Sequence, residues 1–282
     1  MFKPISVVGS LLVMVACTQT EEAAVGDGEP GDDGATLPTE MERVVLHEVF
    51  TGSNCGPCLE ADEILLDVLH DNPDRHVFIS HQVGSDPYVS YEGVSRRMYY
   101  LPDEETYSIP YVYADGVNGF HPVELNEDAG YTQADFDEFA AAPAYLDISV
   151  SHTVTDQTVE IEVSLLPLAD NDSEYLTLQL AIIEGETSLN VGSNGQTEFH
   201  NVMKKMVPDH TGTSVGPLVR GETIVVSETY TFQGEYDDST AYDNPIDHDS
   251  AHTVEEFDDL TVVAFVQNDE TWEVLHSAWS GQ

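Results

Sequence analysis

Residues 44–58 read VVLHEVFTGSNCGPC and combine an apolar run, a polar turn and a closely spaced pair of cysteines. Residues 44–50 are mostly apolar or β-branched, as in a buried strand, and residues 51–54 have the polar and glycine composition of a turn. Cys55-Gly56-Pro57-Cys58 follows, and the next apolar residues recur at the spacing of one helix face: Ala61, Ile64, Leu65, Val68 and Leu69. We therefore expect a strand, a turn and a helix, with both cysteines at the junction.

This junction favours thiol chemistry. Unpaired backbone N–H groups and the helix dipole stabilise a thiolate at a helix N-terminus, which lowers the pKa of Cys55. Pro57 suits the first helical turn, because a backbone N–H at that position would have no hydrogen-bond partner within the helix. A CxxC pair can also be half of a zinc site, with His47 and His81 as conceivable further ligands. The sequence has no second CxxC pair and no zinc-finger histidine spacing, so we predict a redox pair and no metal.

A second motif further along the chain supports this interpretation of the CGPC tetrad. It reads Ser108-Ile109-Pro110-Tyr111-Val112-Tyr113-Ala114-Asp115-Gly116. Together the two motifs resemble the thioredoxin superfamily. The resemblance implies a cis Ile109-Pro110 bond beside the cysteines, a following strand, and a hairpin turn at Asp115-Gly116. It also implies roles for six residues: Cys55 and Cys58 as catalytic cysteines, and Ile109, Pro110, Gly56 and Pro57 as substrate-binding residues.

Two departures from the family pattern affect the expected site. Asn54 stands where thioredoxin has a tryptophan. Glu48 is the nearest counterpart of the family's buried aspartate, one residue further from Cys55 than that spacing predicts. On a buried strand Glu48 would have a raised pKa and could accept the Cys58 proton; it could equally be a half-exposed strand residue. Between the motifs, residues 90–100 are predicted to be helical. Arg96 and Arg97 in this helix are expected to form ion pairs with nearby acids, and contact with a substrate anion is the alternative.

The N-terminus has the features of an export signal. Lys3 precedes an apolar run over residues 5–16, which is about the length of a signal-peptide core and short of the ~20 apolar residues that span a bilayer. The run ends Leu12-Val13-Met14-Val15-Ala16-Cys17 and resembles a bacterial lipobox, which implies a signal peptide at 1–16 and lipidation of Cys17. Residues 17–40 are predicted to form an acidic flexible linker.

Charge narrows the possible partners. The chain has 8 Lys and Arg against 53 Asp and Glu, a formal net charge of −45 at pH 7. Such a surface repels phosphates, so we expect no nucleic-acid partner and membrane association by the lipid anchor only. The chain has three cysteines, Cys17, Cys55 and Cys58, so the C-terminal half has no disulfide framework.

The pattern changes after Pro143. Residues 41–143 are predicted to be the thioredoxin-like α/β domain, closed by a helix that Thr132 and Asp135 cap. Residues 144–282 alternate apolar and polar residues in short runs, which predicts an all-β immunoglobulin-like sandwich domain. Acidic and histidine residues cluster at 235–259, where calcium or a transition metal could bind; EF-hand spacing is missing, and solvated acids are the expected outcome.

A looser likeness covers most of the mature chain. The Phe50-Thr51-Gly52 lead-in to CxxC, the segment 200–206 (HNVMKKM) and the segment 262–267 (VVAFVQ) resemble the Omp28-related outer membrane lipoproteins. That resemblance implies an exported protein, anchored by lipid on the periplasmic or surface face of the bacterial outer membrane.

Two functions are consistent with these patterns. The first is an extracytoplasmic, membrane-anchored thiol–disulfide oxidoreductase that acts on protein disulfides with an electron-transfer partner and no cofactor. The second is a surface binding or adhesion lipoprotein in which Cys55–Cys58 is a structural disulfide in a non-catalytic thioredoxin-like domain.

Overall fold

A computed structural model describes residues 36–101, 108–123, 130–241 and 243–281. Residues Leu37–Gln282 form one compact unit. The predicted signal peptide, Cys17 and most of the 17–40 linker lie outside the described residues. No helix in the described ranges is both long and apolar enough to cross a membrane.

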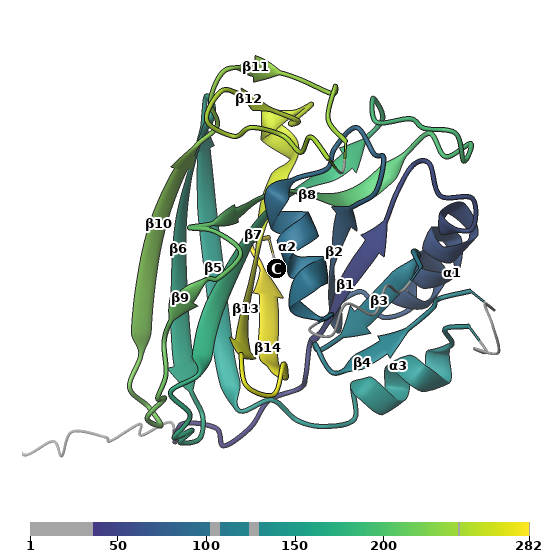
Figure 1. The fold of residues 1–282 in the computed structure, drawn as a ribbon. Helices are drawn as coiled ribbons and strands as arrows, with labels where there is room; N and C mark the ends of the chain where they lie inside the picture. Colours follow the sequence, from purple (N-terminus) through teal and green to yellow (C-terminus); the bar gives the residue numbers. More distant parts are fainter. Residues whose placement is uncertain (1–35, 102–107, 124–129, 242, 282) are drawn as a thin grey trace, which may run out of the picture. The chain divides into compact units, whose positions relative to one another are not determined.

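The first half of this unit alternates strands and helices (Figure 1). Its elements are β1 (Val45–Thr51), α1 (Cys58–His70), β2 (His76–Gln82), α2 (Tyr91–Tyr99), β3 (Tyr111–Ala114), β4 (Asn118–Phe120) and α3 (Gln133–Phe139). The predicted strand–turn–helix over 44–69, the helix over 90–100 and the Thr132–Asp135 capping box are confirmed. The hairpin turn is also confirmed: Asp115 and Gly116, between β3 and β4, have φ values of 47° and 75°.

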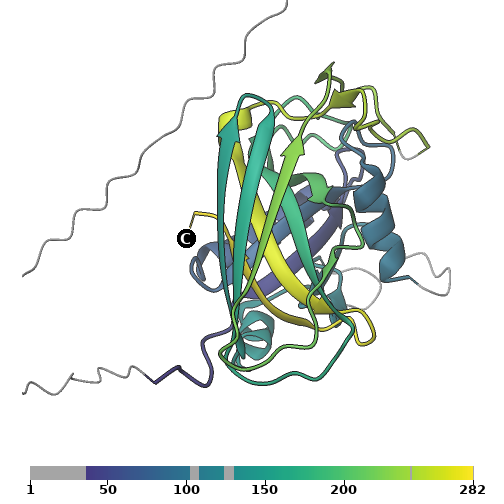
Figure 2. The same cartoon turned by 90° about the vertical axis from the view of Figure 1, so that its left-hand side faces the viewer.

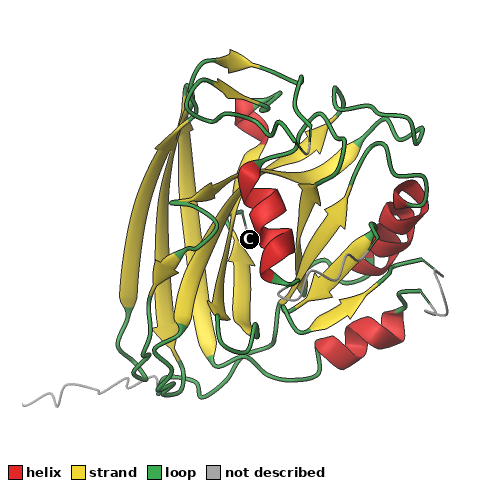
Figure 3. Ribbon diagram, viewed as in Figure 1, coloured by secondary structure: helices red, strands yellow, loops and turns green. Residues whose placement is uncertain are grey.

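The second half is almost entirely β. Its strands are β5 (Leu146–Thr155), β6 (Thr158–Pro167), β7 (Leu176–Thr187), β8 (Phe199–Val207), β9 (Thr213–Ser214), β10 (Ile224–Thr231), β11 (Glu235–Tyr236), β12 (Ala251–His252), β13 (Leu260–Asn268) and β14 (Val274–Trp279). A short 3-10 helix, η1 (Phe257–Asp259), precedes β13. As Figure 3 shows, the structure is mostly β with few helices.

One mixed sheet runs through both halves. Its strand order is β14-β13-β7-β8-β2-β1-β3-β4, and β9 pairs with β7 at the side. The junction is the parallel pairing of β2 with β8, at Ser80 opposite Val202. The sheet is therefore continuous across the expected boundary at 143/144.

A second sheet, β10-β6-β5, completes a two-layer arrangement in the C-terminal half. Figure 2 shows this sheet lying over the yellow strands β13 and β14, and β5 contacts both of them. Alternate apolar residues of both layers fill the space between, among them Ile148, Ile161, Leu178, Val262 and Ala264. Two packed β layers thus exist, but the inner layer belongs to the shared sheet, and a separate immunoglobulin-like domain is not confirmed.

The two faces of β1 have different neighbours, because successive side chains of a strand point to opposite faces. Val45 and Val49 pack with Leu65 of α1 and Phe136 of α3. Leu46, on the other face, packs with residues of β7, β8 and β13. Every residue of β1 is buried, as expected for a strand in the middle of a sheet covered on both faces.

Candidate redox site

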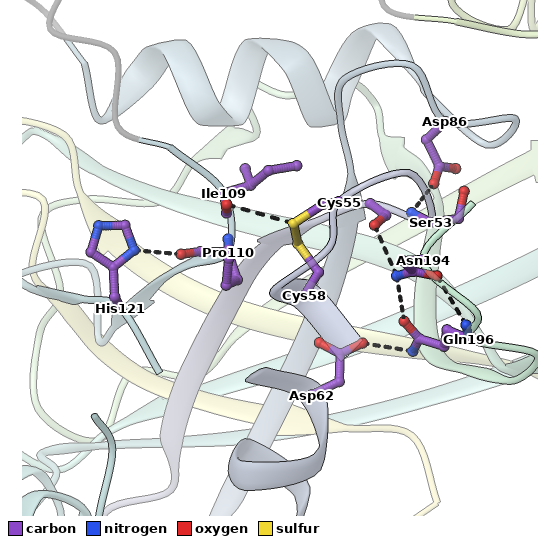
Figure 4. Close-up of a disulfide and its surroundings, with 11 residues drawn as sticks. Ser53, Cys55, Cys58, Asp62, Asp86, Ile109, Pro110, His121, Asn194 and Gln196 are labelled. Carbon is purple, nitrogen blue, oxygen red and sulfur yellow. Dashed lines mark hydrogen bonds between the residues drawn. A yellow bond between two sulfur atoms is a disulfide. The ribbon is translucent and has the colours of Figure 1, made fainter. Parts of the chain in front are cut away.

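Cys55 and Cys58 form a disulfide between the end of β1 and the start of α1, with their Cα atoms 5.4 Å apart (Figure 4). The turn is held by two backbone hydrogen bonds, from Cys55 N to Gly52 O and from Cys58 N to Cys55 O. Cys58 is fully buried, Cys55 is partly exposed, and Gly56 and Pro57 between them are exposed. An approaching thiol or disulfide therefore reaches the sulfur of Cys55 and not that of Cys58.

The second predicted motif lies beside the disulfide. The Ile109-Pro110 peptide bond is cis, and the Ile109 carbonyl oxygen is 3.5 Å from the Cys55 Sγ. His121 Nδ1 donates a hydrogen bond of 2.7 Å to the Pro110 carbonyl oxygen. The structure thus brings together the two motifs that the sequence separates by about fifty residues. It leaves the substrate-binding role of Ile109, Pro110, Gly56 and Pro57 as a prediction.

A buried carboxylate that the sequence analysis did not single out fixes the turn before Cys55. Asp86 accepts hydrogen bonds from the backbone N–H of Ser53 at 2.6 Å and of Tyr88 at 2.9 Å. Burial raises the pKa of Asp86, and the hydrogen bonds from Ser53 oppose that shift. An Asp-Pro pair after a strand signals a turn, so sequence alone could locate Asp86 in a turn but not against Ser53.

The expected role of Glu48 does not fit its surroundings. Its carboxylate accepts hydrogen bonds from Arg96, from Tyr100 and from His81 Nε2, on the face of the sheet covered by α2. Burial raises the pKa of Glu48, but the Arg96 guanidinium and the hydrogen bond from His81 outweigh burial and hold it well below its usual range. The predicted raised pKa is therefore wrong, because the carboxylate has a buried counterion. The predicted ion pairing of Arg96 is confirmed.

The two histidines of the zinc alternative are engaged elsewhere. His47 Nε2 lies 2.8 Å from the Tyr131 hydroxyl, and His81 pairs with Glu48. Burial, with a smaller effect of His76, lowers the pKa of His47 to about 3. Within the described ranges, 235–259 included except for residue 242, no three His, Cys, Asp or Glu side chains converge as a metal site would need.

Asp62 is the carboxylate that lies next to the disulfide. It occupies α1 one helical turn after Cys58, and Figure 4 shows its carboxylate beside the base of that cysteine. Burial raises the pKa of Asp62 to about 6, and a hydrogen bond of 2.8 Å from Gln196 Nε2 acts in the opposite direction. Gln196 comes from the loop between β7 and β8, far along the chain. The i, i+4 spacing of Cys58 and Asp62 was visible in the sequence, but the partial burial of Asp62 was not.

The fold of this chain is similar to those of solved bacterial proteins. HBP35 of Porphyromonas gingivalis matches with a TM-score of 0.60 and 14% identity over 85% of this chain and 75% of that chain. A protein from Agrobacterium tumefaciens matches with a TM-score of 0.51 and 13% identity over 88% of this chain and 97% of that chain. A domain of the outer membrane lipoprotein Omp28 from Porphyromonas gingivalis reaches a TM-score of 0.30 at 18% identity, over 49% of this chain and 87% of that domain.

The first two likenesses show that a similar fold occurs in other proteins. No protein-family model and no curated protein sequence matches the chain.

Proposed function

We propose that this protein is an exported thiol–disulfide oxidoreductase whose residues 41–143 form a thioredoxin-like domain with Cys55 and Cys58 as its redox pair. The observation that carries the proposal is the placement of a partly exposed Cys55 at the start of α1, bonded to a buried Cys58 and adjoining Ile109 and the cis-Pro110. An accessible attacking sulfur paired with a shielded resolving sulfur is the arrangement that dithiol exchange needs.

The helix start supports the reactivity of Cys55. The 13-residue α1 begins at Cys58, with Pro57 as its N-cap residue and no side chain capping it. Its first backbone N–H groups and its dipole favour negative charge at the preceding turn, where the reduced Cys55 sulfur lies. A thiolate formed there would attack a substrate disulfide, and Cys58 would then displace the reduced substrate from Cys55. The cycle needs a dithiol electron donor and no soluble cofactor.

The backbone at 109–110 suits a protein substrate. The Pro110 residue itself is buried, whereas Ser108 is exposed and Ile109 partly exposed beside the Cys55 sulfur. An extended segment of substrate can lie along this edge and pair with the backbone there, as peptides do when they add to a sheet edge. Ile109 and Pro110 are therefore proposed to hold the substrate, with Gly56 and Pro57 at the other side of the sulfur.

The proposed location rests on the sequence. The apolar run that ends at Cys17 resembles a lipobox, and the acidic segment after it has the composition of a tether. We place the protein on the periplasmic or surface face of a bacterial outer membrane, held by lipid on Cys17. Replacing Cys17 with serine should move the protein from the membrane fraction to the soluble fraction, and an unchanged distribution would refute the anchor.

A second function, ligand binding with a structural disulfide, is favoured by one cavity. It has a volume of about 690 Å³ and is lined mainly by one face of α2 (Tyr91, Val94, Met98 and Tyr99) together with Gln179 and His210. Tyr91 and Met98 are largely exposed there. None of the lining residues belongs to the redox turn, so this binding function would be independent of Cys55 and Cys58.

Insulin reduction separates the two functions. With dithiothreitol as electron donor, the wild type should accelerate the precipitation of insulin chains, and the Cys55→Ser variant should match the rate without protein. Cys58→Ser should trap a mixed disulfide with the substrate, because the resolving thiol is missing. Equal rates for wild type and Cys55→Ser would reject the oxidoreductase and leave the binding function.

A further inference from the structure

The loop between β7 and β8 is seated on the turn that carries the cysteines. Asn194 N donates to Ser53 O at 3.0 Å, and Ser193 N donates to the Asn54 side-chain oxygen at 3.0 Å. Gly192 fits against the same turn so closely that a Cβ atom there would lie 2.5 Å from the Ser53 carbonyl oxygen. The C-terminal half of the chain thus forms one wall of the redox site.

The same loop directs the Gln196 side chain towards α1, the helix that begins at Cys58. Gln196 is buried, its backbone N–H donates to Asn194 Oδ1 at 3.0 Å, and its side-chain oxygen accepts a hydrogen bond from Asn194 Nδ2 at 3.4 Å. Its Nε2 is therefore directed at Asp62 Oδ2, 2.8 Å away (Figure 4). Asp62 follows Cys58 by four residues, so the two side chains occupy neighbouring positions on one face of α1.

We propose that Asp62, oriented by Gln196, accepts the proton of Cys58 when that thiol attacks and returns it to the departing substrate sulfur. This proposal rests on the exchange function proposed above. It makes Asp62 a catalytic residue, since it would take the proton of the reacting thiol, and Gln196 a positioning residue supplied by the C-terminal half.

Reduction of one substrate disulfide takes two successive displacements at sulfur. The Cys55 thiolate attacks one sulfur of the substrate disulfide, the substrate S–S bond breaks, and the first substrate thiolate leaves. Cys58 then gives its proton to the Asp62 carboxylate while its sulfur bonds to the Cys55 sulfur and the bond from Cys55 to the substrate breaks. The second substrate sulfur leaves with the electron pair and takes the proton from Asp62. The enzyme dithiol is oxidised, the substrate disulfide is reduced, and a dithiol donor restores Cys55 and Cys58.

The surroundings of Asp62 suit this task. A base works best when its pKa lies near the working pH, and burial brings the pKa of Asp62 to about 6. Burial is the largest influence on the pKa of this carboxyl, and the Gln196 hydrogen bond opposes it. Glu48, by contrast, is held ionised by Arg96 on the other face of the sheet.

The test follows both cysteines in one experiment. The reduced full chain is mixed with the aromatic disulfide 5,5′-dithiobis(2-nitrobenzoate). Release of the first thionitrobenzoate reports attack by Cys55, and release of the second reports displacement by Cys58. In Asp62→Asn we expect the first phase to be unchanged and the second to slow by about 10²-fold. The second-phase rate of the wild type should show an inflection near pH 6 that Asp62→Asn lacks.

Two further variants make the result specific. Asp67→Asn, the same change at an exposed position of α1, should behave as wild type. Gln196→Leu removes the hydrogen bond that lowers the pKa of Asp62, so the inflection in the second-phase rate should move to higher pH. If Asp62→Asn does not fold, this shift alone still tests whether Asp62 accepts the Cys58 proton. A second phase in Asp62→Asn with wild-type rate and pH profile would overturn the proposal while leaving the exchange function intact. A wild type that releases no thionitrobenzoate would instead reject the exchange function.

Discussion

The Arg96 guanidinium donates two hydrogen bonds to the Glu48 carboxylate in the core, from Nε at 3.0 Å and from Nη2 at 2.6 Å. The exposed fraction of the side chain is 0% for Arg96 and 1% for Glu48. Arg96 also donates to Gln267 of β13, so one guanidinium links β1 and α2 with a C-terminal strand. The pair therefore joins the two halves of the chain through the shared sheet.

Removing one partner of this pair should destabilise the protein strongly. Arg96→Met leaves the Glu48 carboxylate buried with its remaining hydrogen bonds and no arginine, and we expect a loss of about 3–5 kcal/mol in the free energy of unfolding. Urea denaturation measures it. The double variant Glu48→Gln/Arg96→Met should recover part of the loss, since no buried charge is left unpaired. The account would be contradicted if the double variant lost as much free energy of unfolding as Arg96→Met and Glu48→Gln lose separately, added together.

The free energy of unfolding should depend on pH in part through the protonation of His47. Burial lowers its pKa in the folded state from 6.5 to about 3, so the unfolded chain binds a proton that the folded chain does not. Its contribution is complete above pH 6.5 and is lost as the pH falls, at up to about 1.4 kcal/mol per pH unit for one proton.

The comparison that isolates this effect uses two substitutions. His47→Gln should unfold with a smaller loss of stability between pH 6.5 and pH 4 than the wild type, in urea titrations at each pH. His70→Gln, at an exposed histidine, should keep the wild-type slope. Asp62 and Asp115, whose pKa values burial raises to about 6, act in the opposite direction in all three proteins and cancel in the difference. Equal slopes for wild type and His47→Gln would contradict the prediction.

The contact between Gly192 and Ser53 should tolerate no side chain. A Cβ at position 192 would lie 2.5 Å from both the carbonyl oxygen and the hydroxyl of Ser53, so the loop or the redox turn must move. Gly192→Ala should lower the free energy of unfolding by about 1–3 kcal/mol. Ser193→Ala, at the exposed neighbouring position, serves as the control and should leave the urea midpoint unchanged. A Gly192→Ala midpoint equal to that of the control would show that the loop is not seated on the turn.

The disulfide itself should add little stability. It links residues only three apart in sequence, and closing so short a loop contributes about 2 kcal/mol by chain entropy. Cys55→Ser/Cys58→Ser should therefore remain folded, with at most this loss by urea denaturation. A variant that cannot fold would favour the structural-disulfide function over exchange.

Local structure could be predicted from the sequence because local signals specify it. The strand over 45–51, the helix over 58–70 and the capping box at Thr132 and Asp135 each depend on residues that are neighbours along the chain. The cis-proline was identified by resemblance, and the structure places it against Cys55. These features sufficed to locate the disulfide.

Long-range partners could not be predicted in this way. Glu48 was expected near Cys58, but strand alternation puts its side chain opposite Val49 and towards Arg96, whose position depends on where α2 packs. The pKa of Asp62 is raised by burial and lowered by a hydrogen bond from Gln196, which lies more than a hundred positions away along the chain. The alternating pattern after residue 144 correctly indicated strands, but it carries no information on which sheet they join.

The pairing of β2 with β8 has a consequence for how the chain can be divided. A fragment that ends near residue 143 keeps β1, α1 and the cis-proline beside the cysteines, but it loses the loop that packs on the redox turn and the strand that pairs with β2. Six of the seven residues of β2 are buried, and its sequence, HVFISHQ, contains no lysine, proline or carboxylate to discourage pairing with another chain. Such a fragment would present a bare edge and self-associate. By pairing with β2, strand β8 thus protects the half that bears the cysteines from aggregation.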